Sequence, residues 1–209
     1  MWVLGIATSA PWSAEMCLGQ VRINEILADP ARDWDGDGTT NFKDDEWVEI
    51  VNVGTSPVVL DSLRLSDAGN GFRFGFSGTL AAGAQLLVLG STSVAWETAA
   101  GTSTVGLSLN NAGDTVRLWQ LSGSDTVLVD EYTYAVHEGT DDRSTGRVPD
   151  GSDTWMVFDA LNPYSAATPP LGTGCPPTPG GPNACPTAVE GRTWTHVKSL
   201  FQREVEQAP

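Results

Sequence analysis

The stretch around which this chain is organised reads Asp33-Trp-Asp-Gly-Asp-Gly-Thr-Thr-Asn-Phe-Lys-Asp44 and continues directly into Asp45-Glu-Trp-Val-Glu-Ile50. Three acids stand at alternate positions, and a glycine follows the third of them. Counted from the first acid, the pattern matches positions one, three, five, six, nine and twelve of a calcium-binding loop. The candidate metal ligands are Asp33, Asp35, Asp37, the backbone carbonyl of Thr39, Asn41 and the closing carboxylate of Asp44.

The spacing suits calcium because Ca²⁺ takes six to eight hard oxygen ligands at about 2.3–2.6 Å, and a tight loop supplies them from every second side chain. Gly38 stands where the chain must bend sharply. The alternative is a solvated acidic turn, since Asp, Asn and Gly also form ordinary loops. The closing residue is Asp44 instead of the longer glutamate, and the flanking segments have strand patterns. The sequence therefore predicts a Ca²⁺ loop that joins two strands and stiffens their connection.

Outside this loop the pattern is one of short strands separated by turns. Val21–Leu27 and Glu46–Val53 are rich in strand-forming residues, and Phe72–Phe76 alternates aromatic side chains with others. About eight such segments, with Ser91–Thr104 expected to be a long loop, predict an all-β sandwich or barrel. The side chains expected in its core are Ile23, Val48, Ile50, Leu60, Leu65, Leu87, Leu89, Val116 and Leu118.

Several of these segments resemble, in order, the strands of the lamin-tail domain family. The matching stretches are Ile23–Leu27, Asp45–Asn52, Val58–Leu65, Leu80–Gly83, Leu109–Leu118, Val129–Asp130 and the exit segment Asp142–Trp155. The resemblance covers about Val21 to Tyr164 and implies an immunoglobulin-like β-sandwich over residues 20–164. It also implies a secreted or surface protein of the bacterial type, which often carries an Asp-rich insert at this place. It supplies no catalytic residues, and without a heptad rod the nuclear scaffold role of animal lamins does not carry over.

Composition limits the possible partners. The chain of 209 residues has 11 basic and 26 acidic side chains, a formal charge of −15. Phosphate backbones repel such a chain, so nucleic-acid binding is disfavoured. Residues 1–19 resemble a signal peptide without its usual basic start, and no later stretch has the roughly 20 apolar residues of a membrane span. We therefore expect a secreted or cell-surface protein whose partner is a surface protein or a glycan.

The C-terminal part of the chain, from residue 165, has a different composition. Residues 165–190 are rich in Pro, Gly and Thr and are predicted to form an extended linker, and residues 191–209 a tail with a short helix. Cys175 and Cys185 enclose a short loop that a disulfide could close, and two free thiols are the alternative.

Catalytic motifs are missing. The two histidines, His137 and His196, lie in no recognised constellation, and there is no nucleophile elbow or phosphate loop. The function expected is a non-catalytic, calcium-binding structural or adhesion module. One alternative is a carbohydrate-binding module that uses Trp34, Trp96 and Trp155 as a stacking platform. Another is a metal-dependent phosphoester hydrolase that holds its metal in the acidic loop.

Overall fold

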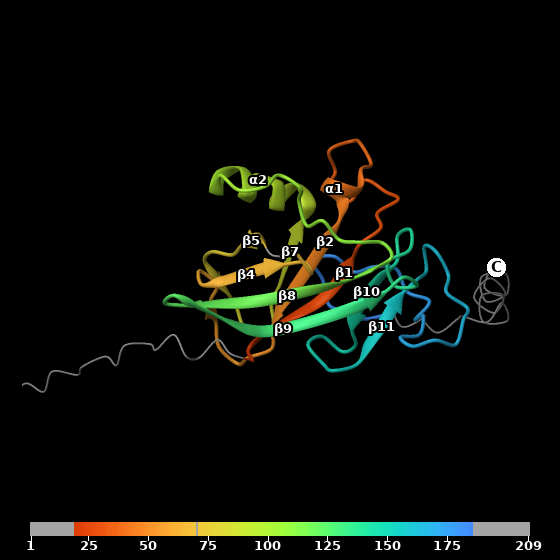
Figure 1. Cartoon of the computed structure of the whole chain (residues 1–209). Helices are drawn as coiled ribbons and strands as arrows, with labels where there is room; N and C mark the ends of the chain where they lie inside the picture. The colour runs from red at the N-terminus through yellow and green to blue at the C-terminus, as the bar shows by residue number, and fades with distance from the viewer. Residues whose placement is uncertain (1–18, 70, 186–209) are drawn as a thin grey trace, which may run out of the picture.

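The chain folds as an immunoglobulin-like β-sandwich, shown by a computed structural model that describes residues 19–69 and 71–185. Nearly all of the signal-peptide-like segment and the whole predicted helical tail lie outside these residues. Within the described parts of the chain, no helix is long and apolar enough to cross a membrane. The elements (Figure 1) are β1 (Val21–Leu27), α1 (Phe42–Asp45), β2 (Trp47–Asn52), β3 (Val58–Val59), β4 (Leu63–Ser66), β5 (Phe72–Gly75), β6 (Thr79–Leu80), β7 (Gln85–Leu89), α2 (Gly90–Ala100), β8 (Gly113–Ser122), β9 (Asp125–Ala135), β10 (Ser144–Arg147) and β11 (Trp155–Phe158).

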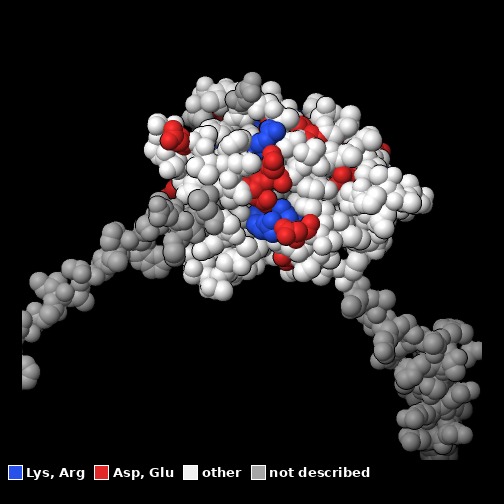
Figure 2. Space-filling model, turned by 60° about the horizontal axis from the view of Figure 1, so that its bottom comes forward, with Lys and Arg blue, Asp and Glu red and all other residues white. Residues whose placement is uncertain are grey.

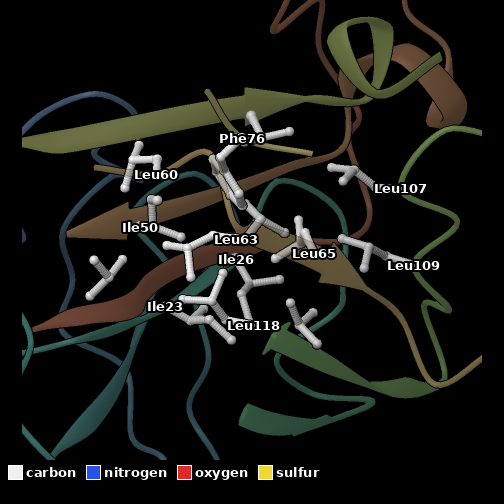
Figure 3. Close-up of a cluster of buried hydrophobic side chains, with 14 of the residues drawn as sticks. Ile23, Ile26, Ile50, Leu60, Leu63, Leu65, Phe76, Leu107, Leu109 and Leu118 are labelled. Carbon is white, nitrogen blue, oxygen red and sulfur yellow. The ribbon is translucent and has the colours of Figure 1, made fainter. Parts of the chain in front are cut away.

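Two antiparallel sheets enclose the core. One has the strand order β11-β10-β1-β2-β7 and the other the order β5-β4-β8-β9, while β3 and β6 form a small separate pair. Alternate side chains of each strand point between the sheets, because successive side chains of a strand face opposite ways. Ile23 and Ile50 face each other across β1 and β2, and Leu65 and Leu118 do so across β4 and β8. Figure 3 shows these side chains gathered in one buried apolar cluster.

The predicted core is correct except on β7. Leu87 and Leu89 are only partly buried, whereas Val88 is 1% exposed. The register explains the difference, since Val88 lies opposite Val48 and Leu86 lies opposite Ile50, both of which face the core. A continuous apolar run carries no alternation, so it does not reveal which of its faces points inward.

The long loop expected over Ser91–Thr104 is wrong, because most of it forms helix α2. The helix has no strong apolar stripe and no side-chain N-cap, and it ends at Gly101 in the left-handed conformation. Tertiary contacts hold it instead: Ser93 Oγ donates to the carbonyl of Arg73 at 2.6 Å, and buried Glu97 accepts from the amide of Gly106 at 2.9 Å. Packing rather than intrinsic propensity therefore decides this helix.

The exit segment completes the first sheet and ties it to the second. Arg147 of β10 donates to both oxygens of Asp130 on β9 at 3.0 Å, and Asp130 also accepts from the amide of Ile23 on β1 at 2.9 Å. Arg22 of β1 pairs with Asp153 at 2.7 Å. Figure 2 shows the underside of the view in Figure 1, where basic and acidic side chains alternate in one narrow column on a largely uncharged face. Such mixed charges join strands from both sheets.

The segment predicted as a free linker is instead packed on the sandwich as far as residue 185. A disulfide joins Cys175 to Cys185, whose Cα atoms lie 5.4 Å apart. We call the enclosed residues 175–185 the disulfide lid. Asn183 of the lid is buried and donates to the carbonyls of Asn24 and Arg147, both at 3.0 Å. Its irregular backbone agrees with the composition, but its amides find fixed partners on the first sheet, which a linker would not have.

Beneath the lid lie acidic side chains of β1 and β2. Glu49 alternates with inward Val48 and Ile50, and a register shift between Ile23 and Glu25 turns Glu25 to the same outer face. Glu25 accepts from the amide of Thr178 at 3.1 Å, and Glu49 accepts from the amide of Gly180 at 2.7 Å. Both glutamates are fully buried. Asp150 joins them by accepting from Asn24 and from the amide of Asn183. Burial raises the pKa of Glu25 and of Glu49 to about 7, because desolvation outweighs the hydrogen bonds that favour their charged forms.

Candidate metal centre

The acidic loop between β1 and α1 brings three of its predicted ligands together. Carboxylate oxygens of Asp33, Asp35 and Asp37 all lie within 4.8 Å of one another. Asp33 and Asp37 are exposed and Asp35 is half-buried. Three carboxylates this close repel one another in the absence of a cation, so the arrangement suits a divalent ion.

The loop holds this shape through its own backbone. The amides of Gly36 and Gly38 donate to the two oxygens of Asp33 at 2.7 and 2.9 Å. Gly38 has φ = +92°, which confirms the sharp bend expected at this position and which a side chain would strain. The amide of Asp37 donates to Asp35 at 3.1 Å. Backbone amides of the loop therefore fix the positions of the carboxylates, two of which remain exposed.

The later candidates have different neighbours. Thr39 donates from both its amide and its hydroxyl to Asp37 at 2.7 Å, and these bonds hold the pKa of Asp37 below its usual value. Asn41 caps α1 by accepting from the amide of Asp44, and it donates to the Asp44 carboxylate at 2.9 Å. Asp44 does not belong to the close group formed by the first three acids. The loop thus leads into one turn of helix, whereas the sequence predicted only strands on either side of it.

Asp45 is the organising residue that the sequence pattern did not single out. It is fully buried, and it accepts from the amides of Trp34 at 2.5 Å, Asp35 at 3.0 Å and Asn41 at 2.7 Å. One carboxylate therefore joins the start and the end of the loop. The available signal was its position, one residue past the closing acid and directly before a buried strand, where an acid needs several donors.

A second carboxylate, more than 100 residues later in the chain, holds the first residues of the loop. Asp142 is buried and accepts from the amide of Ala31, the guanidinium of Arg32 and the indole of Trp34 at 2.9–3.0 Å. Neighbouring Asp29 is partly buried beside Asp141, and both effects raise its pKa. The acids that anchor the loop are thus separate from those that would hold an ion.

The three tryptophans proposed as a sugar platform pack against different partners. Trp34 packs edge-on against Trp47 and is held by Asp142. Trp96 packs against Phe74 from helix α2. Trp155 stacks on Tyr132 at 3.5 Å, with the Arg147 guanidinium over its ring. Each is part of a separate packing contact, so the expectation of a shared platform is wrong.

The antiparallel β-sandwich agrees with the family whose sequence model matches the chain. A sequence model of the lamin tail domain matches residues 16–135. The chain belongs to the lamin tail domain family. No curated protein and no solved structure matches it. The lamin tail domain is an immunoglobulin-like structural module, and here β10 and β11 add two strands beyond the matched residues.

Proposed function

We propose that this lamin tail domain is a non-catalytic structural or adhesive module of the cell exterior, and that its first loop binds calcium. The observation that carries the proposal is the convergence of Asp33, Asp35 and Asp37 in a loop whose backbone amides fix their positions. Asn41, Asp44 and the carbonyl of Thr39 would complete the oxygen shell. The ion would then relieve the mutual repulsion of the carboxylates and fix the entry of the chain into β2.

The external location is supported by two features. The Cys175–Cys185 disulfide is of the kind that persists in oxidising compartments. The acidic composition, with only 11 basic residues, suits a protein that meets abundant calcium and avoids nucleic acids. The hydrolase alternative is less favoured, because its candidate ligands all come from one loop, while catalytic metal sites gather ligands from several elements.

The calcium proposal is tested by calorimetric melting of the whole chain in calcium, in magnesium and in chelator. With calcium a hundredfold above the dissociation constant, mass action predicts about 2.7 kcal/mol of stabilisation. For a domain of this size the melting temperature should rise by several degrees. Magnesium should stabilise much less, because it demands a smaller octahedral site and loses its water reluctantly.

Two variants locate the effect. Asp35→Ala removes a central ligand and should abolish most of the calcium-dependent rise. Asp125→Ala removes an exposed acid from the β8–β9 turn and should leave that rise unchanged. A melting temperature that is indifferent to calcium, magnesium and chelator would make the loop a plain acidic turn.

A further inference from the structure

The outer face of the four-stranded sheet contains a hollow of about 340 Å³. Leu65 and Leu118 point into the core, so their neighbours in β4 and β8 point outward. The register places Arg117 opposite Ser66, and Trp119 two pairs further along, on the same face. Phe72 of β5 completes the floor, because it pairs with Ser66 from the other side. Aromatic rings, a guanidinium and a hydroxyl therefore converge on one side of the sheet.

The described residues of the rim leave the hollow open. They are Ala68, Gly69 and Gly71 on one side and Thr126 of β9 on the other. Their small side chains leave room for a ring to lie across the floor. The volume is at the small end of the about 300–1,000 Å³ that ligand pockets occupy.

The polar groups in the hollow are arranged for a neutral ligand. The Trp119 indole donates to Ser66 Oγ at 2.9 Å, which fixes the ring in place. The Arg117 guanidinium lies 3.3 Å from Glu131 and donates to the carbonyl of Asp67 at 3.3 Å, so its charge is balanced. Its Nη2 makes no hydrogen bond within the described residues. A donor thus remains for a ligand oxygen, while Glu131 and the charge of −15 disfavour an anion.

We propose that this hollow binds one ring of a neutral saccharide. A pyranose has an apolar C–H face and a rim of hydroxyl groups, and it therefore needs a flat aromatic floor with polar groups around it. Phe72 and Trp119 supply the floor, and Arg117 and Thr126 supply polar groups at its edge. The inference rests on the adhesive part of the proposed function and names its ligand, but it does not require calcium in the acidic loop.

The test is binding of the whole chain to immobilised neutral and acidic glycans, followed by calorimetric titration with the free oligosaccharide that binds best. Wild type should bind neutral glycans. Trp119→Ala should weaken the affinity by about tenfold or more, a loss of at least about 1.4 kcal/mol. Arg64→Ala is the matched control, because this outward arginine bonds the backbone carbonyls of Asp61 and Leu63 and does not line the hollow.

A second variant keeps the test decisive if removal of the indole unfolds the sheet. A Cβ built on Gly71 would meet no described atom within 4 Å outside its two chain neighbours, so Gly71→Trp should fill the hollow without disturbing the fold. It should abolish glycan binding and leave the melting temperature unchanged. Failure of neutral glycans to bind, binding of acidic glycans alone, or binding that survives Gly71→Trp would overturn the proposal. Melting in calcium reports on the acidic loop separately, so failure of either proposal is recognised by itself.

Discussion

At the scale of single residues, the most informative side chains are acids that are buried with neutral partners only. Glu25 and Glu49 accept hydrogen bonds from a serine, an asparagine and lid amides, and no basic side chain of the described residues donates to them. Their proximity to each other and to Asp150 disfavours full ionisation. Protonation of these acids is therefore part of what makes the folded chain stable.

The stability of the fold should fall as the pH rises from about 4.5 to about 7. Over this window the unfolded chain releases the protons of Glu25 and Glu49 while the folded chain keeps them, because their folded pKa values are raised to about 7. The full shift of one such group corresponds to about 3 kcal/mol. Urea unfolding at about pH 5 and about pH 8 measures the difference, and Glu49→Gln should reduce it. A free energy of unfolding that is equal at both pH values, or highest at the alkaline one, would refute this view.

At the scale of elements, the disulfide lid is a cross-linked loop that donates hydrogen bonds to the buried acids. Thr178, Gly180 and Asn183 all lie between the two linked cysteines. The first two donate to Glu25 and Glu49 of the sheet, and the amide of Asn183 donates to Asp150 in the turn between β10 and β11. The cross-link therefore holds together the donors that the buried acids require. In the chain-entropy picture, closing a loop of this length contributes roughly 2–3 kcal/mol.

Replacing both cysteines by serine should loosen the lid before it affects the sandwich. We expect faster hydrogen exchange at the amides of Thr178, Gly180 and Asn183, because local opening no longer has to work against the cross-link. The amide of Val48, within the interior strand β2, should exchange as in wild type and serves as the internal reference. Unchanged exchange in the lid would mean that the hydrogen bonds to the acids suffice without the disulfide.

The same elements show how far the sequence predicts the structure and where it stops. Alternation located β1, β2, β4 and β8 and their inward residues, since one face of each strand packs on the core. It failed for β7, whose apolar run has no polar face, and for α2, whose Ser, Thr and Ala residues carry no helical stripe. Of the acids beneath the lid, Glu49 looks like an outward residue of an ordinary strand, and Glu25 reaches the same face only through the irregularity after Ile23. What buries them lies more than 100 residues later, and no local pattern reports that.

The candidate metal loop was predictable for a different reason. Its ligand spacing and its glycine are local, and the structure places Asp33, Asp35 and Asp37 together as the spacing requires. The supporting carboxylates were not predictable to the same extent. Asp142 comes from the exit segment, and only the fold brings it to Trp34. The sequence alone therefore predicts the residues that could bind an ion, whereas only the fold shows which residues hold the loop in place.

At the scale of the whole molecule, the family match and the folded unit have different ends. The match stops at residue 135, but β10 pairs with β1, and β11 carries the buried Val157 and Phe158. Without them, one edge of β1 would lose its backbone partners, and Asp130 would lose Arg147. We therefore propose residues 19–185 as the unit that folds.

A chain that ends at Ala135 should fail to fold, whereas one that ends at Cys185 should melt cooperatively. The shorter chain would leave a half-paired strand and uncovered apolar surface, both of which favour aggregation. The longer chain is the matched control, because it keeps every strand and the lid. Circular dichroism melting and size-exclusion chromatography decide between them. A monomeric, cooperatively melting product that ends at Ala135 would show that the matched region is self-sufficient.

The position of β1 between β2 and β10 also affects when each edge of this strand can pair during folding. One edge of β1 can pair early with β2. On the other edge, Leu27 cannot pair until Ser144 has been synthesised. This second edge stays open while more than 100 further residues are synthesised. Contacts between such distant positions form slowly, so assembly in milliseconds to seconds is expected instead of microseconds. Throughout that interval the open edge of β1 is also one that a neighbouring chain could pair with.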